Sequence, residues 1–259
     1  MAEKIAIVTA AGKGIGEAIA RELNARGYKL ALMSTSDASI RLAKELGGIG
    51  FQGSVTDIGD MKKLVDETFR HYGRIDVVAN NTGRQGPILQ KHGVQARPPL
   101  DAAKLTYDPD FESDEIIKLP DAAWHDILDL MVLNVVRMCR LVTPLMIGQG
   151  GGAIVNISGM ESIQPRQLYT ASVLRLALHG VTKIYADRYG RHGIRMNNVL
   201  PGVLENEQTA SEQIRRAIPL NRKGTMAEVA KTVAFLLSED AGYISGQNIL
   251  VDGALNRGI

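Results

Sequence analysis

The chain has 259 residues, of which 45% are hydrophobic and 22% are charged, and its formal net charge is +2 at pH 7. A chain of this length and composition can bury one large core, so we expect a single domain over residues 1–259. The small net charge argues against binding to nucleic acid or to an anionic membrane surface. No run approaches the roughly 18 apolar residues of a membrane-spanning helix, and the N-terminus lacks the layout of a signal peptide.

Cysteine and histidine usage limits the chemistry further. Cys139 is the single cysteine, so no disulfide can form within the chain, and a reducing, cytoplasmic location is expected. We interpret Cys139 as a small buried hydrophobic residue on a helix. The five histidines show no metal-ligand spacing, so we expect no metal site.

The first stretch, residues 4–16, reads K-I-A-I-V-T-A-A-G-K-G-I-G and predicts a buried strand that enters a glycine-rich turn. The turn holds Gly12, Gly14 and Gly16, and a helical pattern starts near Ile15. Glycines let backbone N–H groups approach a pyrophosphate, and the start of a helix adds a positive partial charge there. Because a second strand follows, the stretch favours a dinucleotide-binding site.

Strand and helix signals alternate along the rest of the chain. We expect strands at residues 28–34, 50–53, 75–79, 152–158, 194–200 and 248–251. We expect helices at residues 36–46, 58–72, 121–147, 167–190 and 225–237, with N-terminal caps at Asp57, Asp121 and Thr225, the last in a capping box with Glu228. Right-handed crossovers between such elements give a Rossmann-type α/β fold, a doubly wound parallel sheet between two helical layers.

Residues 84–120 depart from this alternation. They contain five prolines and an acidic cluster, and they show no clear hydrophobic period. Long stretches without secondary structure inside a compact domain usually cover a site, bind something or are disordered. Two interpretations stay open: a solvated insertion, or a substrate-side loop or interface arm.

Several ordered strings make the chain resemble the short-chain dehydrogenase/reductase family over nearly its full length. They include T-A-A-G-K-G-I-G at residues 9–16, N-N-T-G at 80–83 and I-V-N-I-S at 154–158. Further on come G-I-R-M-N-N-V-L-P-G at 193–202, I-P-L-N-R-K-G at 218–224 and I-S-G-Q-N-I-L-V-D-G at 244–253. Asn134, in an expected helix, matches a family asparagine.

The resemblance implies a nicotinamide cofactor at the carboxyl ends of the strands, and hydride transfer to or from a carbonyl or hydroxyl carbon of a small-molecule substrate. It also implies a homotetramer or homodimer. The residues that it places at the cofactor are Thr9, Gly12, Lys13, Gly14, Ile15, Gly16, Ser34, Thr35, Ser36, Ser54, Val55, Asn81, Gly83, Pro201, Gly202 and Val203.

The second strand indicates which cofactor is preferred. An acid about 20 residues past the glycines would bind the 2′-hydroxyl of NAD, but residues 33–36 read M-S-T-S and carry no carboxylate. Lys13 lies in the glycine turn, where a cation can reach a 2′-phosphate. We therefore expect NADP(H), while NAD(H) stays possible. Ala10, Ser54 and Asn206 replace a glycine, an aspartate and a threonine that the family usually has.

The family catalyses with a tyrosine acid/base, a lysine that lowers the tyrosine pKa, a serine that polarises the substrate oxygen and an asparagine that orders a relay water. Here the Tyr-x-x-x-Lys motif is broken, because Tyr169 is followed by Val173. Counting back from Lys183 puts the lysine position on Arg175 and the tyrosine position on Ala171. The early tyrosine resembles the layout of the enoyl reductases.

The serine position is altered as well, since it falls on Gly159, with Ser158 and Ser162 close by. Two hypotheses follow. In the first, Tyr169 is the acid, Arg175 the cation, Ser158 the polarising hydroxyl and Asn134 the relay residue. In the second, the cofactor site is retained and catalysis is impaired or lost. Arginine is always charged, but its planar fork would hold the ribose differently from a lysine.

Overall fold

The computed structural model describes the chain except residues 1–2, 83–85, 94–114, 165–170, 208–211 and 259. Its centre is a sheet of seven parallel strands in the order β3-β2-β1-β4-β5-β6-β7. Their bounds are β1 Ile5–Thr9, β2 Lys29–Ser34, β3 Ile49–Gln52, β4 Val77–Asn80, β5 Gly152–Ile157, β6 Ile194–Pro201 and β7 Asn248–Val251. The strand order reverses between β1 and β4, where ligands bind in open α/β sheets.

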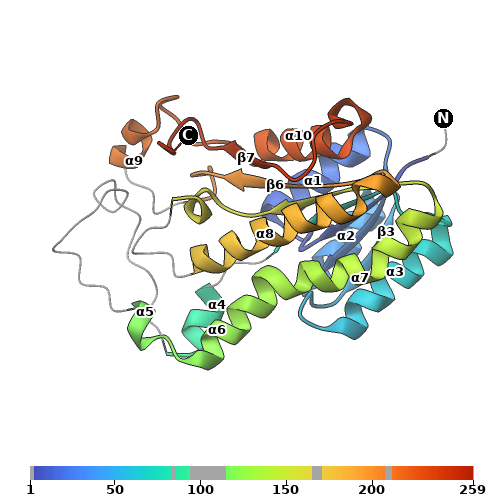
Figure 1. The fold of residues 1–259 in the computed structure, drawn as a ribbon, viewed down its shortest axis with the longest axis horizontal. Helices are drawn as coiled ribbons and strands as arrows, with labels where there is room; N and C mark the ends of the chain where they lie inside the picture. Colours follow the sequence, from blue (N-terminus) through green and yellow to red (C-terminus); the bar gives the residue numbers. More distant parts are fainter. Residues whose placement is uncertain (1–2, 83–85, 94–114, 165–170, 208–211, 259) are drawn as a thin grey trace.

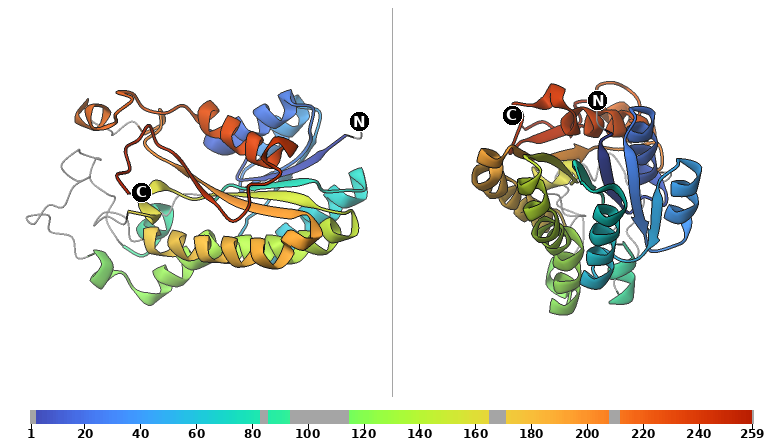
Figure 2. Two further views of the ribbon diagram at one scale, coloured as in Figure 1. Left: turned by 45° about the horizontal axis from the view of Figure 1, so that its top comes forward. Right: turned by 90° about the vertical axis from the view of Figure 1, so that its right-hand side faces the viewer.

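Helices cover both faces of the sheet (Figures 1 and 2). On one face, α1 (Gly14–Ala25) packs against α10 (Met226–Leu237), and α2 (Ala38–Glu45) lies beside β2 and β3. On the other face lie α3 (Ile58–Tyr72), α7 (Asn134–Gly148) and α8 (Ala171–Tyr189). The expected doubly wound α/β fold is therefore confirmed.

Alternate residues of each strand feed two separate cores, as the pleat of a strand requires. Ile7 and Val78 face the α3, α7 and α8 layer. Their strand neighbours Val8 and Val77 face the α1 and α10 layer. Cys139 on α7 is buried in the first core, as the sequence predicts, and burial raises the pKa of its thiol to about 12.

Two of the three expected caps are confirmed. The Asp57 side chain accepts from Asp60 N at the start of α3, and Thr225 and Glu228 form the capping box of α10. The third cap was wrong, because α6 (Asp121–Leu128) has Pro120 at its N-cap position and no side-chain cap bond. Proline fixes a φ compatible with the entry into the helix, but it has no side-chain acceptor.

The long helix expected at 121–147 is confirmed as one helical stretch, Asp121–Gly148, but its hydrogen-bond register changes within it. It consists of α6, a π-helical turn at Asp129–Leu133 and then α7, which starts at Asn134. Residues 84–120 also hold two short helices, α4 (Gly86–Lys91) and α5 (Glu115–Lys118), which the sequence did not reveal. Short 3₁₀ turns at Met160–Ser162, Gly190–His192 and Glu239–Ala241 and the helix α9 (Glu212–Ala217) complete the described elements.

One helical stretch, Asp121–Gly148, is long and apolar enough to cross a membrane, with a mean hydropathy of 1.7 over its most apolar window. The sequence-based expectation that no stretch is long and apolar enough for a membrane-spanning helix was therefore wrong. Half of that window is buried inside the protein, where Val135, Met138 and Val142 join the core. Because the core helix of a water-soluble protein passes the same test, the match is weak evidence for a membrane span.

A row of asparagine amides links β4, β5, β6 and the start of β7, and three of the four, Asn80, Asn156 and Asn198, are buried. Asn80 donates to Asn156 (2.9 Å), Asn156 to Asn198 (3.1 Å) and Asn198 to Asn248 (2.7 Å). These residues occupy matching register positions on neighbouring strands. Thr182 of α8 joins the row through both Asn156 and Asn198, so it fixes α8 against the sheet. This matters because α8 carries residues of the site described next.

Candidate active site

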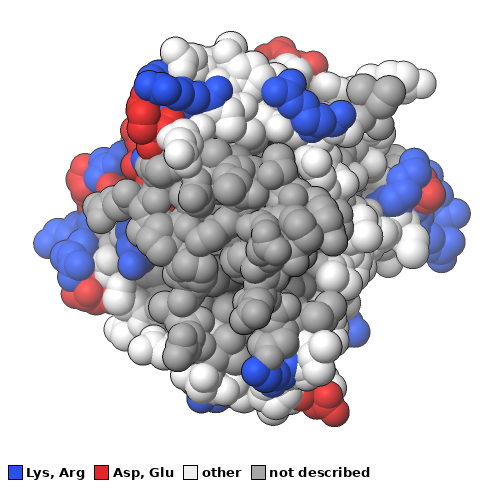
Figure 3. All heavy atoms as spheres, turned by 90° about the vertical axis from the view of Figure 1, so that its left-hand side faces the viewer, with Lys and Arg blue, Asp and Glu red and all other residues white. Residues whose placement is uncertain are grey.

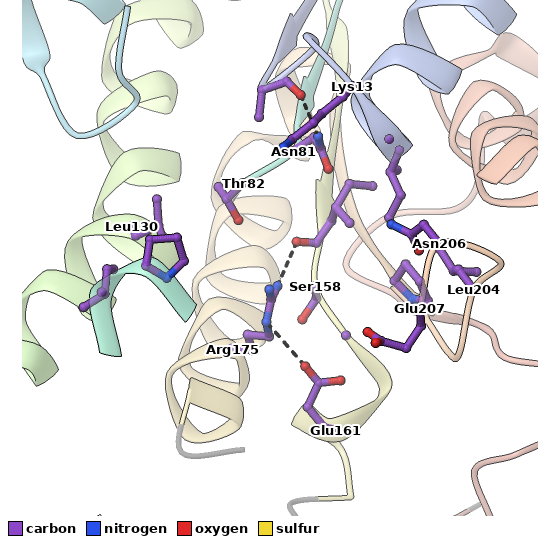
Figure 4. Close-up of a pocket in the computed structure, with 18 of the residues that line it drawn as sticks. Lys13, Asn81, Thr82, Leu130, Ser158, Glu161, Arg175, Leu204, Asn206 and Glu207 are labelled. Atoms are coloured by element: carbon purple, nitrogen blue, oxygen red, sulfur yellow. Dashed lines mark hydrogen bonds and ion pairs between the residues drawn. The ribbon is translucent and has the colours of Figure 1, made fainter. Parts of the chain in front are cut away.

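A cavity of about 1120 Å³ opens at the carboxyl ends of β1, β4, β5 and β6 (Figure 4). Its lining comes from segments far apart in the sequence, which is typical of a ligand site at the switch point of an open α/β sheet. Figure 3 shows one face of the molecule, and at its edge basic and acidic side chains of the described residues lie near one another.

The glycine turn forms one end of the cavity. Gly14 lines it with a left-handed φ of 63°, which favours glycine. A Cβ on Gly16 would lie 2.3 Å from the Ala10 carbonyl oxygen and 2.6 Å from Asn81 Nδ2, so only glycine lets the turn pack against the end of β4. A Cβ on Gly12 would lie 2.8 Å from Ser34 Oγ.

The start of α1 has the features of an anion site. Its N-cap residue, Lys13, is extended and makes no side-chain cap bond, so the first N–H groups of the helix are left for a ligand. The Lys13 side chain is exposed and lines the cavity together with Ile15 and Thr35. This arrangement fits a dinucleotide with its pyrophosphate at the start of α1.

The other cofactor candidates divide into lining and supporting residues. Ser54, Asn81, Pro201, Gly202 and Val203 line the cavity, and so do Thr56 and Asn206. The remaining described candidates are not among the lining residues: Thr9, Gly12, Gly16, Ser34, Ser36 and Val55. Gly83 lies outside the described residues.

Two of these supporting residues show what they do. Thr9 Oγ1 donates to the Asn81 carbonyl at 3.2 Å and accepts from Asn81 N at 3.1 Å, so it joins the ends of β1 and β4. Ser34 Oγ donates to the Ser36 carbonyl and accepts from Ser39 N, so its hydroxyl is engaged at the start of α2. The hydrogen bonds of Thr9 and Ser34 join protein groups to one another, so they would form without a bound cofactor.

The expected catalytic residues meet only in part. Ser158 follows β5 directly and lines the cavity beside Arg175 of α8, as Figure 4 shows. Asn134 is buried, its amide donates to the Leu130 carbonyl, and it is not among the lining residues, so its relay role stays a prediction. Tyr169 lies outside the described residues, and its role is a prediction as well.

Arg175 is held by two contacts at the carboxyl end of β5. Its Nη1 donates to the Ile157 carbonyl at 3.2 Å, and its Nε lies 3.6 Å from Glu161 Oε1. The side chains of Arg175 and Glu161 are 14% and 21% exposed, so solvent screens this ion pair only in part. Burial lowers the pKa of Arg175 and the Glu161 carboxylate opposes that change, while the guanidinium stays charged.

Glu161 is a site residue that sequence reasoning missed. A Cβ on Gly159 would lie 2.5 Å from both of its carboxylate oxygens, so glycine at 159 leaves the room that Glu161 takes up. Gly159 is also where the resemblance placed the family serine. The family motif is changed at two positions, to glycine at 159 and to arginine at 175. The Glu161 carboxylate pairs with Arg175 and occupies the space beside Gly159, so it connects the two changes.

His179 is the second residue that was missed. It lies one helical turn after Arg175 on α8, and its Nε2 is 3.0 Å from Ser158 Oγ. Burial first and the Arg175 charge second lower its pKa to about 4, so it is neutral at pH 7. The spacing of four residues from Arg175 was a signal that could have linked the two on one helix face.

Comparisons with known proteins agree with this geometry. Residues 4–216 match the family model described as short chain dehydrogenase. A 3-oxoacyl-[acyl-carrier-protein] reductase of Staphylococcus aureus is 30% identical, over 97% of this chain and 98% of its own length. The dehydrogenase/reductase SDR family member 4 of Caenorhabditis elegans is 30% identical over 97% and 95%, and a 3-oxoacyl-[acyl-carrier-protein] reductase of Thermotoga maritima is 29% identical over 97% of both.

Proposed function

The chain belongs to the short-chain dehydrogenase family, and from that premise we propose that it is an NADP(H)-dependent oxidoreductase. It would transfer a hydride between the nicotinamide and a carbonyl or hydroxyl carbon of a small molecule. The observation that carries the proposal is a single cavity, with an open helix start and Lys13 at one end and Ser158 and Arg175 at the other.

The nicotinamide, when bound, supplies or accepts the hydride. The chain's own residues bind and polarise the reactants. The N–H groups at the start of α1 would hold the pyrophosphate, and Lys13 with Thr35 would hold the 2′-phosphate. Ser158 would donate a hydrogen bond to the substrate oxygen, and the Arg175 charge would stabilise the negative charge that develops there in the reductive direction.

The proton would come from Tyr169, with the Arg175 charge favouring the phenolate, and Asn134 would support the relay. A keto group is the first substrate class to test, because two relatives carry the name 3-oxoacyl-[acyl-carrier-protein] reductase. Two alternatives are supported less well. The spacing of Tyr169 and Arg175 suggests an enoyl reductase, and the broken motif suggests a dinucleotide-binding protein without turnover.

We also propose a cytoplasmic homodimer or homotetramer. Exposed apolar side chains on α8 support this, since Val173, Leu176 and Ile184 are 48%, 49% and 71% exposed. Light scattering of the purified chain would show the oligomeric state.

A panel of keto and enoyl thioesters with NADPH tests the function. We expect NADPH oxidation with a keto substrate, and a loss of about 100-fold in kcat for Ser158→Ala, since a donor to a developing oxyanion contributes that much. Arg175→Met should lose a similar factor. Arg188→Met, an exposed arginine on the same helix, is the matched control and should keep full activity. NADPH binding without oxidation on any substrate would favour the binding-protein alternative.

A further inference from the structure

Three buried polar side chains form a cluster directly behind the cavity wall. Ser158, Ser162 and His179 are 5%, 0% and 7% exposed. His179 Nε2 lies 3.0 Å from Ser158 Oγ and 3.2 Å from Ser162 Oγ. Of the three, Ser158 also lines the cavity. The position of the hydrogens in this cluster decides what Ser158 can offer to a substrate.

Ser162 accounts for one hydrogen. Its hydroxyl donates to the Gly159 carbonyl oxygen at 2.5 Å, so toward Ser158 and His179 it can only accept. The distance between the two serine oxygens is 3.5 Å, at the outer limit of a hydrogen bond. Ser158 is therefore poorly placed to give its hydrogen to Ser162.

The tautomer of His179 accounts for the second hydrogen. Its Nδ1 is buried and has no hydrogen-bond partner among the residues that the structure describes. An orphaned buried N–H is rarer in proteins than an under-satisfied acceptor. Because a neutral imidazole has one N–H, the proton belongs on Nε2, where Ser158 and Ser162 both offer acceptors.

A serine beside a histidine could also be a nucleophile with its general base, but the surroundings oppose that role. A base must become an imidazolium, and here the charge of Arg175, one helical turn before His179, opposes that change, while no carboxylate bonds to Nδ1 in the described part of the chain. Glu161, an acid in the lining of the cavity, is paired with Arg175. The cluster is suited to donating a hydrogen bond and unsuited to taking up a proton.

We propose that His179 is a positioning residue for Ser158. Its Nε2–H donates to Ser158 Oγ, which frees the Ser158 hydroxyl hydrogen to point into the cavity and donate to the substrate oxygen. With the opposite tautomer, Ser158 would donate to the imidazole and present only lone pairs to the substrate. The inference rests on the proposed function for the identity of the substrate oxygen, but the orientation of the cluster can be measured without any substrate.

The first test is the tautomer. Long-range ¹⁵N–¹H NMR of the full-length protein reports which imidazole nitrogen is protonated, and His179→Gln assigns the signal by its loss. We expect a protonated Nε2 and a bare Nδ1 at neutral pH. A protonated Nδ1 would overturn the proposal, whether or not the protein turns over a substrate.

The second test is a double-mutant cycle on NADPH oxidation. His179→Leu should lower kcat about tenfold, the usual effect of one hydrogen bond, and leave the KM for NADPH unchanged. His179→Gln, whose amide can donate from nearly the same place as Nε2, should restore most of kcat. In a Ser158→Ala background, His179→Leu should cause no further loss, because the bond that it supports is already absent.

A histidine with only a structural role would lower kcat in both backgrounds, and Gln would not rescue it; either result overturns the proposal. His192→Leu, which removes an imidazole away from the cavity, is the matched control and should leave kcat unchanged. If no substrate is turned over by the wild type, the proposed function fails, and the tautomer alone decides the orientation of Ser158.

Discussion

The neutral state of His179 predicts a specific loss of stability in acid. Its pKa in the folded protein is about 4, against an ordinary value of about 6.5. The unfolded chain takes up this proton as the pH falls through about 6.5, whereas the folded chain resists until about 4. The stability that is fully present above pH 6.5 is therefore lost progressively toward pH 4, at about 1.4 kcal/mol per unit. The loss from this one group should reach about 2–3 kcal/mol near pH 4.5.

Urea unfolding of wild type and His179→Gln at about pH 7 and about pH 4.5 isolates this contribution, because glutamine does not titrate. Carboxylates elsewhere lower the stability of both proteins equally. We expect the drop in the free energy of unfolding to be about 2–3 kcal/mol smaller for the variant. Equal drops in the two proteins would show that His179 is not held neutral by burial and by Arg175, and the reasoning would fail.

Three further substitutions test other parts of the cavity. Lys13→Ala should weaken NADPH binding about 30-fold, because one exposed cation near a doubly charged phosphate contributes about 2 kcal/mol to binding. NADH binding should stay unchanged, since NADH has no 2′-phosphate. Equal affinity of wild type and variant for NADPH in titration calorimetry would contradict this. Gly159→Ser should displace Glu161 from Arg175 and cost about 1–2 kcal/mol in urea unfolding; the cost should vanish in a Glu161→Ala background, where neither the overlap nor the ion pair remains, and full additivity would refute the coupling. Ala10→Gly should raise the free energy of unfolding by about 0.5–1 kcal/mol, because Ala10 has a φ of 47°; a less stable variant in calorimetry would contradict this.

Most of the fold could be predicted from the sequence, because strands and helices that bury a face leave a hydrophobic period. β1 followed by the turn at Gly14 was clear for this reason, and so was the Thr225 capping box. The π-helical turn at Asp129–Leu133 could not be predicted, since the hydrophobic period of a long helix does not show where its register shifts by one residue. The cap predicted at Asp121 was wrong because proline is also compatible with the start of a helix, and Pro120 takes the N-cap position of α6.

The lining of the cavity was predictable at the glycine turn, and only in part around Ser158 and Arg175. Lys13 and Gly14 belong to one local motif, so their places follow from the chain direction. Glu161 contacts Arg175, and His179 contacts Ser158, each from a different element, so no sequence spacing indicates these two contacts. Comparison with a family motif showed where residues had changed, but not what the changed residues touch.

Deuterium transfer tests the central claim most directly. The protein is incubated with NADPH carrying deuterium at the reactive carbon of the nicotinamide, and with keto thioesters, and the products are analysed by mass spectrometry. Direct hydride transfer predicts that the product of the wild-type reaction carries one deuterium on the former carbonyl carbon. Over the same reaction time, Ser158→Ala should give no detectable deuterated product. Tight NADPH binding with no deuterium in any product would contradict the proposal that this short-chain dehydrogenase cavity carries out hydride transfer.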